Sequence, residues 1–372
     1  MESRTPSAVS SWSRDRSARN PPTTSGPSTL PRPASSIPST FEAIGSRREA
    51  PAYLGSVVRC RLPETLNPSF SAGGAVALSG LSVPVPTIFG ETGEIDAGQN
   101  ARFTRKLCDA HVDHIFVLGT LGEFPLVTTP ERPVLLEAVI ESLGWHSDAW
   151  VGCGAPATAQ AVAHAEQAEE AGASAVVVVP PYFLTPTEAS IKHYYRAIKK
   201  AVGVPLLGYN IPAHVGYALS PATVHELARE KVLSGIKDTS GSLDSVKGFL
   251  RGAPEGFAVF PGDDLLAGPA IAAGAAGAVM GSANVVPRLG VDLVAAARSG
   301  DAVKVGELET PLRALLVALG AGPFPAVVKY LAHRLRGAEV GYREPYGPLT
   351  AEERGVVDAA LQAAEPLLRP FL

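Results

Sequence analysis

The chain has 372 residues, of which 46% are hydrophobic, so it can bury the core of one large domain or of two ordinary ones. Its 32 Lys and Arg residues and 36 Asp and Glu residues give a formal net charge of -4 at pH 7. That balance provides no basic field to attract nucleic acid or an anionic membrane surface, and we expect a small-molecule partner instead.

Three cysteines, Cys60, Cys108 and Cys153, lie far apart in the sequence. An odd number without close spacing is typical of a reducing compartment, so we expect a cytoplasmic protein with neither a disulfide framework nor a zinc site. The run 265–286 carries no charge and is long enough to resemble a membrane span. Because it is mostly Ala and Gly and contains Pro269, we interpret it as packed core and expect no membrane partner.

Residues 1–78 are rich in Ser, Pro, Thr and Arg and show almost no aliphatic periodicity. Such a segment buries too little apolar surface to order itself, so we predict a disordered extension. No unbroken apolar segment near Met1 indicates a secretory signal. The Arg and Ser content leaves a transit peptide open, but the acidic residues in the segment favour a plain tail or a start assigned too early.

From Leu81 onward, short apolar runs alternate with longer amphipathic stretches. Most runs are rich in β-branched or small residues and several are apolar at nearly every position, which is typical of buried parallel strands. We predict strands at 81–88, 114–120, 149–155, 174–181, 204–210, 233–238, 256–262 and 276–282.

Helical stretches fill the gaps and follow the last run. Two begin with a hydroxyl residue and proline, Thr129-Pro130 and Ser220-Pro221, which is a helix start signal. We predict helices at 97–110, 130–143, 157–171, 187–201, 221–228, 243–251, 264–273 and 288–298.

Eight strand–helix repeats, roughly 28 residues apart, predict an α/β fold, a (β/α)8 TIM barrel over residues 79–298. The rival fold, an open doubly wound sheet, would place a Gly-rich dinucleotide turn after the first strand, and none follows Ile88. Three more helices, predicted at 301–319, 326–336 and 350–368, exceed this plan, so residues 299–372 should form a C-terminal helical appendage packed on the barrel.

Catalytic groups of such barrels lie at the carboxyl ends of the strands. The sixth predicted strand ends in Lys237-Asp238. A lysine at the end of a buried strand is costly unless its amine is neutral or paired, and a neutral amine can attack a ketone. The alternative is an ordinary lysine at the rim that pairs with Asp238.

Two neighbouring strand ends carry further polar groups. Tyr209 ends the fifth strand, one repeat before Lys237, so the two side chains can converge and the phenol can exchange a proton with a substrate oxygen. A packed aromatic is the alternative for Tyr209 alone. After the second strand, Gly119 and Gly122 allow a tight turn that exposes N–H groups and the Thr120 hydroxyl as an anion nest, although it can also be a plain turn.

Six segments carry a wider pattern: GTLGEF (119–124), PPYF (180–183), GYNIPAHVG (208–216), GIKDTSG (235–241), GDD (262–264) and GAVMGSAN (277–284). Their order and spacing resemble the dihydrodipicolinate synthase and N-acetylneuraminate lyase family of class I aldolases. The resemblance extends over nearly all of residues 81–340.

The resemblance implies that Lys237 forms the Schiff base and that Tyr209 is the catalytic phenol. Thr120 and the backbone N–H of Leu121, in the turn that begins at Gly119, would hold the pyruvate carboxylate. Neither a metal nor an organic cofactor is implied, because the iminium of Lys237 serves as the electron sink.

Other positions follow from the same resemblance. Gly262 and Val279 would line the pyruvate pocket, and Tyr182 would lie near a subunit contact. The family is usually a homotetramer built from two tight dimers, so we expect a homo-oligomer, either a dimer or a tetramer.

Four positions bear on specificity. Leu121 stands where many members have a second hydroxyl, and Phe183 stands where the synthase branch has a proton-relaying tyrosine. His214 replaces an arginine that grips the carboxylate of the aldehyde substrate in that branch, and the loss of a bidentate guanidinium is not conservative. Asp264 lies where sugar-cleaving relatives bind hydroxyls, but a synthase-like GDD is equally compatible.

We therefore expect a Schiff-base aldolase or lyase that joins or separates a 2-oxo acid, most simply pyruvate, and an aldehyde. Three alternatives stay open: 4-hydroxy-tetrahydrodipicolinate synthase proper, a 2-oxo-3-deoxy sugar acid dehydratase, and a degenerate barrel that only binds a small acid. His111 and His114 are predicted as surface or interface groups opposite the site, and without a third ligand they predict no metal centre.

Overall fold

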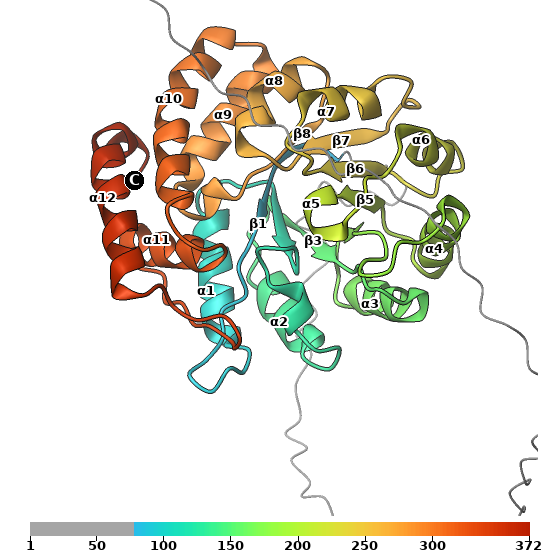
Figure 1. The fold of residues 1–372 in the computed structure, drawn as a ribbon, viewed down its shortest axis with the longest axis horizontal. Helices are drawn as coiled ribbons and strands as arrows, with labels where there is room; N and C mark the ends of the chain where they lie inside the picture. The colour runs from blue at the N-terminus through green and yellow to red at the C-terminus, as the bar shows by residue number, and fades with distance from the viewer. Residues whose placement is uncertain (1–77) are drawn as a thin grey trace, which may run out of the picture. The chain divides into compact units, whose positions relative to one another are not determined.

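A computed structural model of the chain describes residues 78–372 (Figure 1). Eight strands form one sheet in which every registered pair is parallel. Helices cover the outer face, so both faces of each strand are buried, which explains the continuous apolar runs. The strands are β1 (Gly80–Pro84), β2 (His114–Val117), β3 (Asp148–Gly152), β4 (Ala175–Val178), β5 (Leu206–Asn210), β6 (Gly235–Asp238), β7 (Ala258–Pro261) and β8 (Gly277–Val279).

A helix follows each strand, as the sequence predicts. The helices of the barrel are α1 (Ala97–Cys108), α2 (Arg132–Ile140), α3 (Thr158–Glu170), α4 (Glu188–Ala201), α5 (Pro212–Val215), α6 (Pro221–Arg229), α7 (Leu243–Leu250), α8 (Ala267–Ala272) and α9 (Pro287–Ser299). The short helix α5 was not predicted, because its four residues are too few to show a periodic pattern.

The strand order β7-β6-β5-β4-β3-β2-β1-β8 brings the first and last repeats together. The remaining gap between β7 and β8 is crossed by a hydrogen bond from the Ala276 N–H to the Val259 carbonyl, 3.0 Å long. Inward-facing side chains fill the interior of the barrel, among them Phe116, Trp150 and Phe260. The TIM barrel is thus confirmed, and the carboxyl ends of its strands meet on one side.

The predicted helix starts have different outcomes. Ser220 caps α6, and its hydroxyl accepts a hydrogen bond from the Thr223 N–H. Thr129-Pro130, by contrast, does not begin α2, which starts at Arg132 after Glu131. The Thr129 hydroxyl lies 3.1 Å from Nε2 of His164 instead, so its hydrogen bond is tertiary rather than a helix cap.

The C-terminal helices are α10 (Ala302–Leu319), α11 (Ala326–Arg336) and α12 (Ala351–Leu368). In Figure 1 they lie to one side of the barrel, next to α9 and α1. Lys106 of α1 donates to the carbonyl of Arg336 at the end of α11, which ties this group to the first repeat. A capping box of Thr350 and Glu353 begins α12.

The position of His114 differs from the prediction. It was predicted as a surface or interface group, whereas His111 is exposed and His114 is buried. Nδ1 of His114 lies 2.6 Å from a carboxylate oxygen of Asp148, its Nε2 lies 2.9 Å from the Ser79 carbonyl, and its ring stacks on Trp150. The apolar residues that follow His114 draw it into the sheet, and these two oxygen partners satisfy the ring there.

Residues 1–77 lie outside the described residues, and with them Cys60 and all but the last residue of the extension predicted at 1–78. The division of the remainder at residue 299 stays a prediction. In residues 78–372 no helix combines the length and apolar content that crossing a bilayer requires.

Candidate active site

Lys237 lies inside the barrel near the end of β6, with 5% of its surface exposed. Its Nζ is 4.0 Å from the ring centroid of Tyr209 and 5.0 Å from that of Phe116. The alternative of a rim salt bridge with Asp238 does not hold, because Asp238 accepts hydrogen bonds from Asn210 and Ser240 instead. The amine of Lys237 is therefore held against aromatic faces rather than neutralised by a carboxylate.

Gly262 packs directly against this lysine. A Cβ atom at this position would lie 2.8 Å from Cε of Lys237 and 2.1 Å from Oγ1 of Thr239. Any larger residue would push the lysine side chain out of place. Gly262 therefore lies beside the side chain of Lys237, and its place in a pyruvate pocket stays a prediction.

Tyr209 lies directly opposite Lys237 in the β5–β6 register. Its hydroxyl is 3.1 Å from the hydroxyl of Thr120, which joins the turn after β2 to the end of β5. Burial acts to raise the pKa of Tyr209, but the positive charge of Lys237 and the hydrogen bond with Thr120 outweigh it and hold the pKa below its usual range. The lowered pKa makes the phenol of Tyr209 easier to deprotonate than an ordinary tyrosine.

The turn after β2 has two left-handed residues, Leu118 with a φ of 58° and Glu123 with a φ of 52°. Within the described residues, the N–H groups of residues 119–122 donate to no protein acceptor, whereas the Glu123 N–H closes the turn on the Thr120 carbonyl. The side chain of Leu121 is buried in the outer core, so only its backbone can serve a ligand. This arrangement fits the predicted anion nest.

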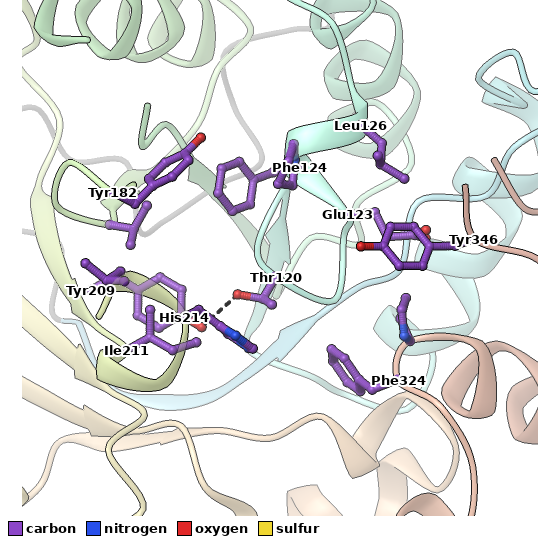
Figure 2. Close-up of a pocket in the computed structure, with 14 residues that line it drawn as sticks. Thr120, Glu123, Phe124, Leu126, Tyr182, Tyr209, Ile211, His214, Phe324 and Tyr346 are labelled. Carbon is purple, nitrogen blue, oxygen red and sulfur yellow. Dashed lines mark hydrogen bonds between the residues drawn. The ribbon is translucent and has the colours of Figure 1, made fainter. Parts of the chain in front are cut away.

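Thr120 and Tyr209 line a cavity of about 320 Å³ (Figure 2). Apolar and aromatic side chains form most of its wall. The lining residues are Thr120, Glu123, Phe124, Pro125, Leu126, Val179, Tyr182, Tyr209, Ile211, His214, Val215, Phe324, Pro325 and Tyr346.

The structure brings most of the sequence-predicted residues to this end of the barrel. Besides Thr120 and Tyr209, the cavity wall includes His214, exposed on α5, and the half-buried Tyr182, whose ring meets Phe124 edge-on at 6.0 Å. Val279 is buried among the inward-facing side chains, and Gly119 packs on the ring of Phe116.

Asp264 lies apart from this group. Its two carboxylate oxygens accept hydrogen bonds from the N–H groups of Gly281 and Ser282, at 3.2 and 2.9 Å. Burial nevertheless raises the pKa of Asp264. The carboxylate braces the loop after β8 and does not line the cavity.

Three wall residues, Phe324, Pro325 and Tyr346, come from the chain beyond the barrel. They lie in the loops before α11 and before α12, and sequence reasoning assigned no site residue there. Loop residues without periodicity give no local signal, and only the packing of the C-terminal helices brings them to the barrel mouth. The neighbouring prolines were the one cue available, since they mark turns.

A known protein family matches most of the chain. The Dihydrodipicolinate synthetase family matches residues 77–364. The chain belongs to this family. The resemblance that the sequence motifs indicated is thus confirmed, and with it the expectation of an enzyme of this lyase family.

The alignments with individual relatives cover most of the length of both proteins. An uncharacterized DapA-like lyase of Halobacterium salinarum is 36% identical over 79% of this chain and 96% of its own. A 4-hydroxy-tetrahydrodipicolinate synthase of Thiobacillus denitrificans is 33% identical over 77% of this chain and 97% of its own. Among solved structures, the E. coli K12 prophage protein YagE, solved in complex with pyruvate, superposes with a TM-score of 0.74 at 29% identity, covering 78% of this chain and 99% of YagE.

Proposed function

We propose that the protein is a class I lyase in which Lys237 forms a Schiff base with pyruvate and joins it to, or releases it from, an aldehyde. The observation that carries this proposal is the contact between Lys237 and Tyr209, in which the amine lies 4.0 Å from the phenol ring inside a closed barrel. Carbonyl attack requires an amine that is not paired with a carboxylate, and Asp238, the adjacent acid, is hydrogen-bonded to Asn210 and Ser240 instead. YagE, solved with pyruvate, lends support from the same family.

The reaction in the cleavage direction begins when the neutral amine of Lys237 adds to the C2 ketone of the substrate. The hydroxyl formed at C2 takes a proton from solvent and leaves as water, which forms an iminium, and the later hydrolysis returns that proton. Tyr209 then takes the proton of the C4 hydroxyl. The C3–C4 bond breaks, its electron pair flows to the iminium nitrogen, and the aldehyde departs. Protonation of the resulting enamine at C3 and hydrolysis of the iminium release pyruvate, so no external oxidant or reductant is needed.

Thr120 connects this chemistry to substrate binding. Its hydroxyl reaches Tyr209, and the unbonded N–H groups of the same turn can receive the pyruvate carboxylate. Because Leu121 offers only its backbone, we assign that N–H, and not a second hydroxyl, as the further carboxylate contact.

We further propose a homo-oligomer located in the cytoplasm. Phe183 and Leu184, in the loop after β4, are 94% and 76% exposed, and two adjacent large apolar side chains at the surface favour a subunit contact. Phe183 also has a φ of 74°, which holds the loop in an unusual conformation. Cys108 and Cys153 are free and buried, which fits a reducing compartment. Light scattering of the full chain and of Phe183→Ser tests the assembly.

Borohydride trapping tests the central claim. Reduction in the presence of pyruvate should add one reduced pyruvate to each chain, and peptide mass mapping should place it on Lys237. Lys237→Ala should gain no adduct and no turnover. Lys247→Ala, which removes an exposed lysine of α7, is the matched control and should behave as the unaltered protein. An adduct that persists in Lys237→Ala would refute the Schiff-base assignment.

A further inference from the structure

The cavity has two chemically different ends. Its base carries the hydroxyls of Thr120 and Tyr209, with Lys237 behind them. Away from the base, the wall consists largely of apolar and aromatic side chains. These are Phe124, Leu126, Ile211, Val215, Phe324 and Tyr346, and Figure 2 shows Phe324 and Tyr346 carried by the C-terminal part of the chain, opposite Tyr209 and Ile211.

Among the described residues, no free guanidinium or ammonium group lines the cavity, and His214 supplies the one imidazole of its wall. The wall contains no Arg or Lys. Arg343 reaches the carbonyl of Leu126, but its guanidinium is engaged by Glu131, and that contact lowers the pKa of Glu131 to about 2. Lys329 is paired in the same way with Glu123. A carboxylate on the incoming aldehyde would therefore find no bidentate guanidinium partner there, and apolar side chains would form most of its surroundings.

We propose, on the basis of the function proposed above, that the aldehyde partner is aromatic and that Phe324 and Tyr346 select it. Each of these two side chains is 53% exposed, so a planar apolar group bound between them and Phe124 would remove apolar surface from water. Aromatic rings also favour edge-on and offset contacts with one another. A cavity of about 320 Å³ lies at the small end of the range for ligand sites, which suits a pyruvate unit joined to one ring.

In the synthesis direction the enamine carbon of pyruvate attacks the carbon of an aryl aldehyde such as benzaldehyde. One C–C bond forms, the aldehyde oxygen takes the proton of Tyr209, and hydrolysis of the iminium releases a 4-aryl-4-hydroxy-2-oxobutanoate. The ring of this product lies on the apolar side of the new bond, and its carboxylate lies at the nest of residues 119–122.

The test compares acceptors in the full-length protein with pyruvate as donor. Benzaldehyde, succinic semialdehyde and glyceraldehyde represent aromatic, acidic and polyhydroxylated acceptors. We expect kcat/KM for benzaldehyde to exceed both others by about tenfold or more, the discrimination typical of a hydrophobic pocket. The double variant Phe324→Ala/Tyr346→Ala should lose about tenfold for benzaldehyde, chiefly through KM, and keep its pyruvate adduct. Val303→Ala removes an exposed apolar side chain of α10 and is the matched control.

The outcomes separate this inference from the proposed function. Absence of a pyruvate adduct in the unaltered protein refutes the function itself. An intact adduct together with a preference for the acidic or polyhydroxylated acceptor, or with no benzaldehyde product at all, overturns the aromatic assignment alone. An equal loss for all acceptors in the double variant, with an unchanged thermal unfolding midpoint, overturns the role of Phe324 and Tyr346.

Discussion

Nζ of Lys329 lies 2.5 Å from Oε1 of Glu123, with both side chains almost completely buried. This contact joins α11 to the turn that carries Thr120, and the amine also donates to the Gly341 carbonyl at 2.9 Å. Burial raises the pKa of Glu123 and lowers that of Lys329, against the attraction between them. The pair is therefore a poor source of net stability, and we infer that it fixes the left-handed Glu123 backbone beside the site.

A first prediction follows from this pair. Lys329→Met leaves a buried carboxylate without its partner and should cost about 3–5 kcal/mol in the free energy of unfolding, measured by urea denaturation. The double variant Glu123→Gln/Lys329→Met removes both charges and should recover most of that loss. If the double variant is as unstable as the single one, the cost arises from lost packing of the lysine stem and not from the unpaired charge.

Tyr209→Phe separates proton transfer from Schiff-base formation. The ring that packs on Lys237 is kept while the hydroxyl is lost, so borohydride should still trap pyruvate on the lysine. Loss of a general acid or base typically lowers the rate by about 10²–10⁴, and we expect kcat of cleavage to fall within that range. Loss of the adduct as well would show that Tyr209 acts in forming the iminium and not only at the C4 oxygen.

Thr120→Val tests the hydrogen bond that helps hold the pKa of Tyr209 below its usual range. Cleavage needs the deprotonated phenol, so kcat/KM for cleavage should rise with pH as Tyr209 titrates. Without the threonine hydroxyl the phenolate is less stabilised, and the rising limb should move to higher pH. Ultraviolet difference titration, with Tyr209→Phe as the reference, measures the ionisation of Tyr209 directly. If the rising limb of the pH profile does not move in Thr120→Val, Thr120 does not stabilise the phenolate.

The barrel was predictable because its signal is local and repeated. Each strand is buried on both faces and appears in the sequence as a continuous apolar run. Several of the longer helices, such as α4 and α6, show a helical period, so the repeats reinforce one another. Boundaries were less accurate: β2 was predicted to extend to Thr120 but ends at Val117. The strand ends because Leu118 adopts a left-handed backbone conformation. A leucine gives no indication of that conformation in the sequence, since residues other than glycine rarely adopt it.

The site residues that lie at strand ends could be predicted from the sequence. Those that reach the site only through tertiary packing could not. Equivalent positions of adjacent parallel strands lie side by side, so the sequence alone predicts that Lys237 lies next to Tyr209. The observed β5–β6 register pairs these two residues. The buried pair of Glu123 and Lys329 spans 206 positions of sequence, and nothing local links the two residues. Phe324 likewise reaches the cavity only through the placement of α11.

His214→Arg tests whether α5 faces the acceptor. A guanidinium at this exposed lining position can pair with a carboxylate, so kcat/KM for succinic semialdehyde should rise about tenfold, while that for benzaldehyde should stay level or fall. His214→Gln is the control, because it is polar but lacks the charge. If acidic aldehydes gain nothing from the arginine, His214 does not face the acceptor.

The last prediction concerns stability at the opposite end of the barrel. Both ring nitrogens of the buried His114 face oxygen atoms, those of Asp148 and of the Ser79 carbonyl, and only the doubly protonated ring can donate to both. Burial acts to lower the pKa of His114, but the charge and hydrogen bond of Asp148 outweigh it and raise the pKa above its ordinary 6.5. Because the folded pKa is the higher one, the stabilisation is complete below about pH 6.5 and is lost as the pH rises through the folded value.

Asp148→Asn removes the charge that sustains this protonation and keeps a side chain of the same size. We expect the variant to be less stable than the unaltered protein at mildly acidic pH, with the gap in unfolding free energy narrowing as the pH rises, because the unaltered protein then loses its imidazolium. Urea unfolding of both proteins across that range measures the gap, and groups that titrate equally in the two cancel. A gap of constant size would mean that His114 is already neutral in the folded protein, so that one of its two oxygen contacts lacks a proton.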